Sequence, residues 1–353
     1  MNGIKPLILV IFVCLCSTFC FSQKKDTTKT AEVEIYKDAC KLLDSAKYKD
    51  AITLFKKAIK IKPDYTEAYN KMALAKLKTQ DYKGAEKDLQ AAQKITPDNY
   101  ESQKTMGILY YETKKFKEAK ATLDSAAALN TDDAELFYYQ AKLMYDGKAY
   151  KPALDACLRA IDLKPKYMDV LYLRGEIRFA MKEYAYCIKE LSEAIKLAPA
   201  ENPNYNAYKT RAKARFELRD YKNAISDWNV YLEAFPDEEG ALISRGACKI
   251  ETRDNTGAIV DFDTAIKLNA KNPVSYNYRG VAKGESRQFV EALKDFDYAI
   301  KLKYDYAGAF VNRAAVKFAS KDKHGACDDL NKADSLGDEM AIKLIDTYCK
   351  HIK

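Results

Sequence analysis

The sequence predicts an all-α fold: a right-handed superhelical solenoid of stacked helix pairs that ends in a capping helix. The first observation is a period of 34 residues, which runs nine times along the 353-residue chain and is interrupted once by three extra residues. A period of this length indicates a single supersecondary unit that is copied and stacked. The second observation is that each copy contains two apolar runs at helical spacing with a short polar stretch between them, which predicts two helices joined by a tight turn.

Residues of matching size occupy matching places in the nine copies. A small residue lies in each predicted first helix: Ala39, Ala73, Gly107, Ala141, Gly175, Ala212, Gly246, Gly280 and Ala314. A second series lies early in each second helix: Ala51, Ala85, Ala119, Ala153, Cys187, Ala224, Ala258, Ala292 and Ala326. A third series follows seven residues later: Ala58, Ala92, Ala126, Ala160, Ala194, Tyr231, Ala265, Ala299 and Ala333. Between these two comes a bulky or apolar residue: Phe55, Leu89, Leu123, Cys157, Leu191, Trp228, Phe262, Phe296 and Leu330. Small residues let helices approach closely and the bulky residue fills the gap, so stacking supplies a core that one unit lacks.

These marks resemble the tetratricopeptide repeat, which has small residues at positions 8, 20 and 27 and an aromatic residue at position 17. The aromatic residue is present in seven copies: Tyr48, Tyr82, Phe116, Tyr150, Tyr184, Tyr221 and Phe289. The resemblance sets the repeats at 32–65, 66–99, 100–133, 134–167, 168–201, 205–238, 239–272, 273–306 and 307–340. The departures are local, because Tyr231 replaces an alanine while Asn255 and Lys323 replace the aromatic residue. The resemblance implies a scaffold that binds a partner, usually a protein, and it names no partner.

The first residues do not belong to the repeats, and residues 1–22 are predicted to be a secretory signal peptide. A basic start and an apolar run over residues 7–21 precede the small Ser22, after which we expect cleavage. One alternative is a lipoprotein signal that ends at Cys20, although Phe19 is bulky where such signals have a small residue. Another is an uncleaved anchor, although the run is shorter than the roughly 20 residues that span a bilayer. We therefore expect a periodic or secreted location to be replaced by a simple statement: the protein is exported to the periplasm or secreted, with lipid anchoring through Cys20 as the alternative.

The remaining chain divides by the repeat. Residues 23–31 are expected to be a disordered leader. Repeats one to five cover 32–201, an insertion occupies 202–204, repeats six to nine cover 205–340, and the capping helix covers 341–353. The insertion is compatible with a bend of the array or with a longer loop alone.

Charge and motifs disfavour several classes of function. The net charge is +8, but 51 acidic residues are mixed among 59 basic ones without a basic stripe, which disfavours nucleic-acid binding. The sequence has neither a phosphate-cradling glycine loop nor a paired-histidine zinc helix. Its two histidines, His324 and His351, lie near the C-terminus, so a histidine-activated nucleophile has no place along most of the repeats. We expect no catalytic residue, no cofactor, and no integral membrane span after signal cleavage.

Repeats five to nine share a charged signature. An arginine precedes the small residue of the first helix: Arg174, Arg211, Arg245, Arg279 and Arg313. An acidic residue holds a fixed place in the second helix: Glu190, Asp227, Asp261, Asp295 and Asp329. Because the first four repeats lack this arginine, we predict a ladder of partly buried guanidinium–carboxylate pairs, whose bidentate geometry favours arginine over lysine. The alternative is that these arginines bind an anionic ligand, which would leave them unpaired in a helix seam at a cost in stability.

Two cysteines are predicted to form a disulfide. Gly337 suits the end of one helix and Asp338 the start of the next, so the last two helices should fold back as an antiparallel pair. Cys327 lies ten residues before this turn and Cys349 twelve after it, and an exported protein favours a bridge between such opposed positions. The alternatives are a zinc site formed with the two histidines, and two free thiols. Buried free thiols are expected at the other cysteines outside the signal: Cys40, Cys157, Cys187 and Cys248.

The resemblance places the partner-binding groove on the first helices, at positions 2, 5, 9, 12 and 13 of each repeat. Repeats three to six offer aromatic and charged residues there: Lys104, Tyr111, Tyr138, Lys142, Tyr145, Tyr172, Glu176, Phe179, Lys209, Lys213 and Phe216. Later repeats offer a smoother lining: Ile243, Ala247, Val281, Gly284, Val311 and Ala315. Tyrosines interleaved with charges suit a peptide, since tyrosine gives a large contact area at a low entropy cost. For the aromatic residues at position 12, packing between repeats is the alternative role.

Two classes of function follow from this surface. The first is an exported, non-catalytic scaffold of the bacterial cell envelope that holds a protein or peptide partner in its groove. The second is a carbohydrate or cell-wall-polymer binder in which the tyrosines stack on sugar rings. The groove contains few asparagines, and this favours a protein partner.

Overall fold

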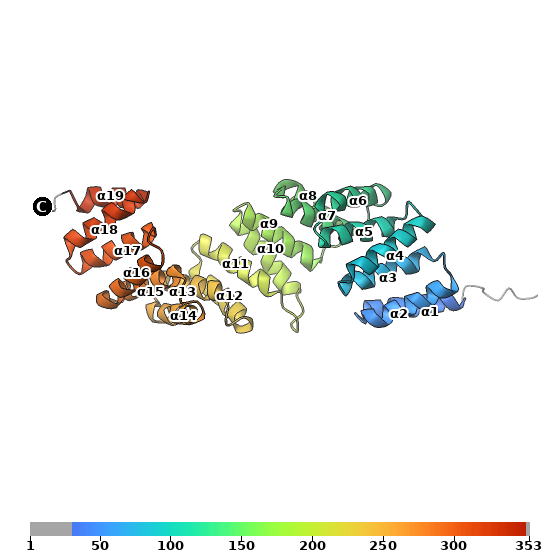
Figure 1. The fold of residues 1–353 in the computed structure, drawn as a ribbon, viewed down its shortest axis with the longest axis horizontal. Helices are drawn as coiled ribbons and strands as arrows, with labels where there is room; N and C mark the ends of the chain where they lie inside the picture. The colour runs from blue at the N-terminus through green and yellow to red at the C-terminus, as the bar shows by residue number, and fades with distance from the viewer. Residues whose placement is uncertain (1–29, 351–353) are drawn as a thin grey trace, which may run out of the picture. The chain divides into compact units, whose positions relative to one another are not determined.

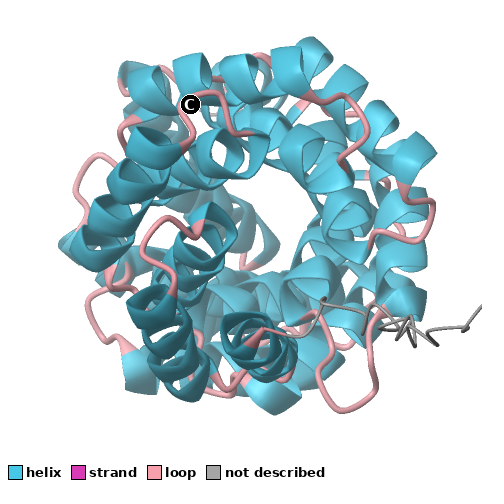
Figure 2. Cartoon of the chain, turned by 90° about the vertical axis from the view of Figure 1, so that its right-hand side faces the viewer, coloured by secondary structure: helices cyan, strands magenta, loops and turns pink. Residues whose placement is uncertain are grey.

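The structure, a computed structural model, describes residues 30–350, which form nineteen helices and no strand (Figure 1; Figure 2). The helices are α1 (Ala31–Asp44), α2 (Tyr48–Ile61), α3 (Thr66–Lys78), α4 (Tyr82–Ile95), α5 (Tyr100–Glu112), α6 (Phe116–Leu129), α7 (Ala134–Asp146), α8 (Tyr150–Leu163), α9 (Met168–Ala180), α10 (Tyr184–Leu197), α11 (Tyr205–Glu217), α12 (Tyr221–Ala234), α13 (Glu239–Glu251), α14 (Asn255–Leu268), α15 (Pro273–Glu285), α16 (Phe289–Leu302), α17 (Ala307–Ala319), α18 (Lys323–Ser335) and α19 (Glu339–Tyr348). The prediction of an all-α array of helix pairs is confirmed. The predicted signal peptide lies outside the described residues, and Ala31, the last residue of the expected leader, is already helical.

A tight turn with a left-handed backbone joins the two helices of each repeat. Its central residues are Ala46, Gln80, Lys114, Lys148, Lys182, Arg219, Arg253, Arg287 and Lys321, with φ between 56° and 72°. The amide of the next residue closes the turn; that of Lys115, for example, donates to the carbonyl of Tyr110 at 2.8 Å. A left-handed conformation costs an L-residue about 1–2 kcal/mol. Packing between the two helices therefore has to offset this cost in every repeat.

A small residue of the first helix lies directly against the bulky residue of the second. Gly246 on α13 faces Phe262 on α14, and a Cβ added to Gly246 would lie 2.6 Å from a ring carbon of that phenylalanine. Gly280 faces Phe296 in the same way, at 2.8 Å. Both rings are fully buried. The residues that mark the period in the sequence thus form the interior of each pair.

The helices group into two compact units, with the division between Leu129 and Asn130. In the first unit α1–α6 form three pairs, and α3 contacts both α1 and α5. In the second unit α7–α18 form six pairs, and α19 packs on α18. The division does not fall at the insertion of residues 202–204, where α10 and α11 contact each other as other successive helices do. There the loop is longer, and Asn204 caps α11 by accepting a hydrogen bond from the amide of Ala207.

The five arginines and five acidic residues of the second unit pair within their own repeats. Arg211, Arg245, Arg279 and Arg313 each donate two hydrogen bonds, from Nε and Nη2, to the two carboxylate oxygens of one aspartate. Arg174 donates from Nη2 to Glu190. The four aspartate side chains are only 3–7% exposed. These pairs form across the seam between the first and second helix of each repeat.

A second cation, which the sequence analysis did not identify, contacts each of the four aspartates. It lies one helical turn after the arginine, and the pairs are Arg215–Asp227, Lys249–Asp261, Lys283–Asp295 and Lys317–Asp329, at 2.6–2.9 Å. In repeat five, Arg178 pairs with Glu183 instead. Repeat two has the acidic residue without the arginine, and there Lys76 lies 2.5 Å from Asp88. The acidic residue and the second cation therefore extend beyond the repeats that carry the arginine.

Each arginine also reaches the preceding repeat. Its Nη1 atom donates to a side chain on the previous second helix, and the pairs are Arg211–Ser192, Arg245–Asn229, Arg279–Asp263 and Arg313–Asp297, at 2.6–2.9 Å. One guanidinium thus connects three helices, for example α12, α13 and α14 through Arg245. Lysine cannot reproduce this planar set of donors, which explains why arginine holds the position.

The C-terminal helix α19 covers the last repeat. Ala341, Leu344 and Ile345 of α19 pack with Phe310 and Leu330 of repeat nine. The sulfur atoms of Cys327 and Cys349 are bonded to each other, and their Cα atoms lie 5.8 Å apart. This bond leaves no thiolate for the alternative zinc site, and His351 lies outside the described residues.

The remaining cysteines are free thiols. Cys157, Cys187 and Cys248 are buried, as expected. The expectation of burial is wrong for Cys40, which is partly exposed. Its side chain lines a surface depression together with Lys71 and Leu74 of α3, so the neighbouring helix does not cover it fully.

We predict that Asp261→Asn lowers the free energy of unfolding by about 2–4 kcal/mol, because it leaves the guanidinium of Arg245 and the ammonium of Lys249 without a counter-charge in a largely buried seam. Asp263→Asn serves as the control, since Asp263 is 44% exposed and its loss should cost no more than about 1 kcal/mol. Urea unfolding followed by circular dichroism measures both variants. Equal midpoints for the two would contradict the structural role of the buried carboxylate.

We also predict that mass spectrometry of unreduced peptides joins Cys327 to Cys349. Replacing both cysteines by serine should lower the stability of the last repeat by about 3 kcal/mol, the chain-entropy value for a loop of this length. The separation of the two residues is 22. Recovery of both thiols in alkylated form, without prior reduction, from protein taken from its native compartment would show that the bridge is absent there.

Candidate functional site

In the second unit, the first helices of the repeats form one continuous layer. Contacts connect α7 with α9, α9 with α11, α11 with α13, α13 with α15, and α15 with α17. Each second helix instead packs mainly on its own partner and on the first helix of the next repeat. Because the first helices crowd together, their free side is the inner side of this unit. We call it the first-helix face of the second unit.

The sequence-predicted groove residues fall on both units. Lys104 and Tyr111 lie on α5 in the first unit, while the others lie on α7, α9 and α11 in the second: Tyr138, Lys142, Tyr145, Tyr172, Glu176, Phe179, Lys209, Lys213 and Phe216. The expectation that Lys104 lines an open groove is wrong, because its residue exposure is 8%. Its ammonium lies 3.4 Å from Glu101 and over the ring of Tyr100.

The aromatic residues at position 12 pack within their own repeats. Each contacts the aromatic residue at position 17 across the turn, and the pairs are Tyr111–Phe116, Tyr145–Tyr150, Phe179–Tyr184 and Phe216–Tyr221, with ring centroids 5.4–6.1 Å apart. All four position-12 residues are nevertheless partly exposed. They therefore help hold the helix pair and still present part of each ring on the first-helix side.

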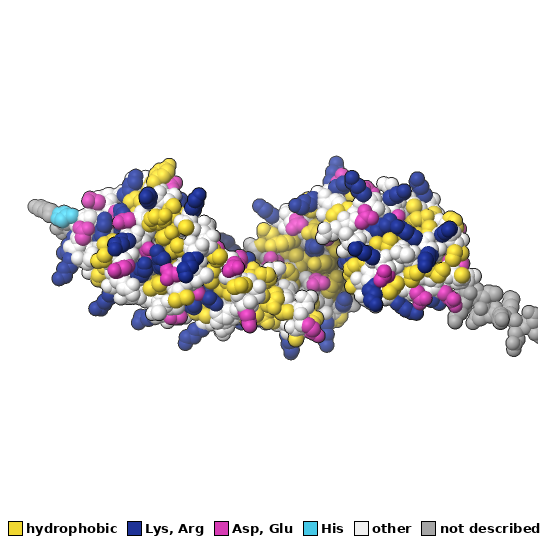
Figure 3. All heavy atoms as spheres, turned by 60° about the horizontal axis from the view of Figure 1, so that its bottom comes forward, with side chains coloured by type: hydrophobic (Ala, Val, Ile, Leu, Met, Phe, Trp, Pro, Cys, Tyr) yellow, Lys and Arg dark blue, Asp and Glu magenta, His cyan; other side chains and the backbone are white. Residues whose placement is uncertain are grey.

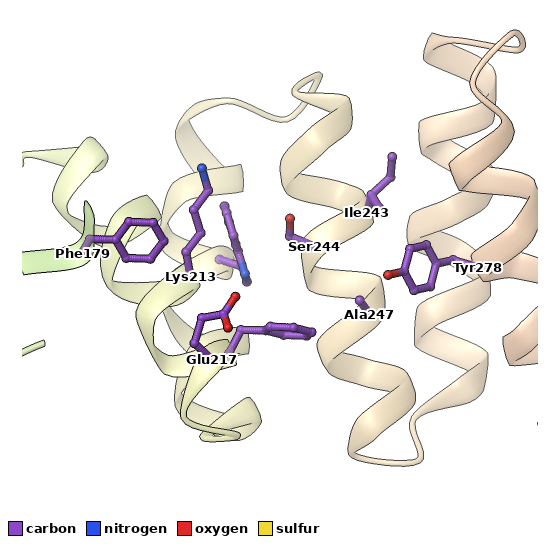
Figure 4. Close-up of a pocket in the computed structure, with 9 residues that line it drawn as sticks. Phe179, Lys213, Glu217, Ile243, Ser244, Ala247 and Tyr278 are labelled. Atoms are coloured by element: carbon purple, nitrogen blue, oxygen red, sulfur yellow. The ribbon is translucent and has the colours of Figure 1, made fainter. Parts of the chain in front are cut away.

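Two of these rings line a cavity of about 250 Å³, which we call the aromatic pocket (Figure 4). Helices α9, α11, α12, α13 and α15 contribute its lining: Phe179, Lys213, Phe216, Glu217, Trp228, Ile243, Ser244, Ala247 and Tyr278. Phe179 and Tyr278 lie at opposite sides, and the hydroxyl of Tyr278 is directed toward α13. Lys213 and Glu217 are exposed at the rim. Sequence reasoning found Phe179, Lys213, Phe216, Ile243 and Ala247, and it missed the rest.

Trp228 gives the pocket its most unusual feature. It occupies the position that holds leucine or phenylalanine in most other repeats, so its larger ring extends beyond the space that those residues fill. The residue is 1% exposed and packs edge-on against Tyr231, with ring centroids 6.0 Å apart. Its Nε1 atom is buried and has no hydrogen-bond partner among the described residues. Buried indole N–H groups normally find an acceptor, so the pocket contains an unsatisfied donor.

Glu176 lies beside the pocket, one helical turn before Phe179 on α9. Burial raises the pKa of Glu176, although the hydrogen bond with Thr210 and the positive charge of Lys213 oppose this shift. Its Oε1 atom is buried and has no hydrogen-bond partner among residues 30–350. Burial and the charge of Glu176 raise the pKa values of Tyr145 and Tyr172 as well, which places both phenols near this carboxylate. The carboxylate is therefore held in a poorly solvated, aromatic surrounding.

Two predicted groove lysines are engaged within the protein. Lys142 lies over the rings of Tyr138 and Tyr139, at 5.4 and 5.1 Å from the ring centroids. Lys209 lies 2.9 Å from Glu238 and 3.4 Å from the hydroxyl of Tyr231. Lys209 therefore connects its repeat to the start of the next, which is a structural role.

Larger features of other site classes are not found in the described part of the chain. On the face drawn in Figure 3, lysine and arginine side chains are interspersed with acidic and apolar ones. Between residues 30 and 350, no group of three or more histidine, cysteine or acidic residues is arranged to hold a metal ion. Within the same range, every helix is too short or too polar to cross a bilayer.

Comparison with known proteins bears on the repeats. A family model described as TPR repeat matches residues 41–80, and one described as tetratricopeptide repeat matches residues 76–143. A search of curated proteins finds no sequence that matches this chain.

Solved structures show the same fold at low identity. One, reported under the functional characterization of pilF from Pseudomonas aeruginosa, is 18% identical, with a TM-score of 0.52 over 58% of this chain and 92% of that one. Another, a tetratricopeptide repeat protein from Parabacteroides merdae, is 17% identical, with a TM-score of 0.46 over 80% of this chain and 97% of that one. The family models, the fold shared with pilF and the helix pairs of 34 residues lead to one conclusion: this chain is a tetratricopeptide-repeat protein.

Proposed function

We propose that this protein is an exported, non-catalytic scaffold that binds a protein or peptide partner on the first-helix face of its second unit. The aromatic pocket is the observation that carries the proposal. Apolar side chains from several helices surround it, and aromatic rings of this kind form the centre of protein–protein binding sites. The exposed Lys213 and Glu217 supply the polar rim that surrounds such a centre.

The composition of the pocket supports a protein partner over a carbohydrate. Sugar rings present many hydroxyl groups, so their sites need several amide and carboxylate partners beside the stacking ring. The pocket lining contains no asparagine or glutamine, and Glu217 is its only carboxylate. The hydroxyl of Ser244 already donates to the carbonyl of Gly240 at 2.8 Å. A pocket that is mainly apolar suits a side chain of a protein better than a polymer of sugars.

The unfavourable state of Glu176 also supports binding at this face. A carboxylate whose pKa is raised by burial destabilises the folded protein when it is ionised. Side chains that reduce stability at a surface are typical of functional sites, where a partner supplies the missing contacts.

Export is the other part of the proposal. The sequence-predicted signal peptide supports it, and so does the disulfide between Cys327 and Cys349, because disulfides persist in oxidising compartments. We propose the periplasm or the cell exterior as the location, with lipid anchoring through Cys20 as the alternative.

We predict that Glu176→Gln raises the free energy of unfolding at pH 7. The pKa of Glu176 is higher in the folded state than its ordinary value of 4.5, so the folded state favours the protonated form. The destabilisation is therefore absent below pH 4.5 and increases as the pH rises through the folded-state pKa. The advantage of the glutamine variant should vanish near pH 4, as measured by urea unfolding at both pH values. A variant that is less stable at pH 7 would show that the contacts with Thr210 and Lys213 outweigh burial.

The binding face is tested by photo-crosslinking in cells. A photoreactive amino acid at Lys213, on the rim of the pocket, should give a discrete protein adduct, because a bound partner covers the rim. The control carries the same residue at Val260, a 58% exposed position on the second helix α14. Equal adducts at the two positions, or co-sedimentation with cell-wall polymer that changing Lys213 abolishes, would contradict the proposal.

A further inference from the structure

We propose that the aromatic pocket takes one large apolar side chain of the partner, and that a main-chain carbonyl of the partner next to that side chain accepts a hydrogen bond from Trp228 Nε1. This inference rests on the proposed function and specifies the chemistry of the partner. It follows from the size of the pocket, its walls and its one unsatisfied donor.

The size of the pocket suits a single side chain. Its volume is about 250 Å³, whereas an apolar cavity of about 150 Å³ is enough to hold benzene. A phenyl ring or a branched aliphatic group therefore fits, and space remains for the main chain that carries it. A whole protein element does not fit, so the pocket acts as an anchor point within a wider contact.

The walls select an apolar group. Phe179, Phe216 and Ile243 present hydrocarbon surface from three different helices, and Ala247 leaves the space between them open. The rim carries one cation, Lys213, and one anion, Glu217, so it does not favour a partner of either charge. A charged side chain inside the pocket would lose its hydration without gaining a counter-charge.

The donor on Trp228 fixes the polar part of the partner. Indole nitrogen is a donor only, so an acceptor has to come from the bound molecule. Because the side chain that fills the pocket is apolar, it has no acceptor of its own. The carbonyl of the main chain lies within a few bonds of every side chain and is the nearest acceptor that such a residue carries. One peptide residue can thus fill the pocket and satisfy the indole.

Two variants separate the parts of this inference. Ala247→Leu fills the pocket, and Ala315→Leu is its matched control, because Ala315 holds the same repeat position on α17 and is exposed outside the pocket. Trp228→Phe removes the N–H group and keeps an aromatic ring. Phenylalanine already holds the equivalent position in three repeats, as Phe55, Phe262 and Phe296, so the fold accepts it there.

The experiment selects decapeptides from a random phage-displayed library on the chain without residues 1–22, and counter-selects on Ala247→Leu. We expect the selected peptides to share one leucine, phenylalanine or methionine. Trp228 is the only tryptophan of the chain, so its fluorescence should change when such a peptide binds. Affinities are measured by the anisotropy of labelled peptides. We expect a loss of at least about twentyfold with Ala247→Leu, a loss of about five- to tenfold with Trp228→Phe, the value of one hydrogen bond, and no change with Ala315→Leu.

The outcomes distinguish this inference from the proposed function. Peptides that lose affinity with Ala247→Leu but bind Trp228→Phe as tightly as the unmodified protein would overturn the main-chain hydrogen bond and leave the binding face intact. Selected peptides that share a charged residue and no apolar one would overturn the apolar anchor alone. Peptides that bind Ala247→Leu without loss, or a selection that enriches none, would overturn both the inference and the peptide-binding function of this pocket.

Discussion

The contact between a small residue of one helix and a bulky residue of the next is the constraint on which this structure depends. Gly246 lies so close to Phe262 that a single methyl group does not fit between them, and the same geometry returns in every repeat that has glycine at this position. Such close approach buries the bulky side chain completely and offsets the left-handed backbone of each turn. It also determines which side of each first helix stays free, and the candidate site is built on that free side.

In the second unit, charged groups add a second level of connection between neighbouring repeats. A buried aspartate holds one arginine and one further cation of the same repeat, while the arginine also reaches the preceding repeat. Buried charges are costly unless every partner is present. Each cluster therefore favours one relative placement of three helices over others, in addition to what apolar packing provides. This rigid frame holds the walls of the aromatic pocket, which come from helices of four successive repeats.

Much of the fold could be predicted from the sequence, because the repeat reports it nine times. The helix pairs and the pairing of Arg211 with Asp227 follow from residues that recur at a fixed spacing. The second cation, for example Lys249, escaped notice because lysines are common on helix surfaces and do not stand out. The burial of Lys104 could not be predicted either, since it depends on which neighbours cover one side chain. The pocket combines residues from several repeats, and no periodic signal marks Ser244 or Tyr278. Trp228 was visible as an exception to the pattern, but only the structure shows that its N–H group lacks a partner.

The central claim is that Trp228 is buried at the base of a binding pocket with its indole donor unsatisfied. The most direct measurement is the ¹⁵N–¹H spectrum of the protein, in which the single tryptophan gives a single indole cross-peak. The account predicts slow exchange of this proton with water in the free protein, and a downfield shift of its resonance when a bound peptide supplies the carbonyl acceptor. Rapid exchange in the free protein, or an unchanged resonance at saturating peptide, would contradict it.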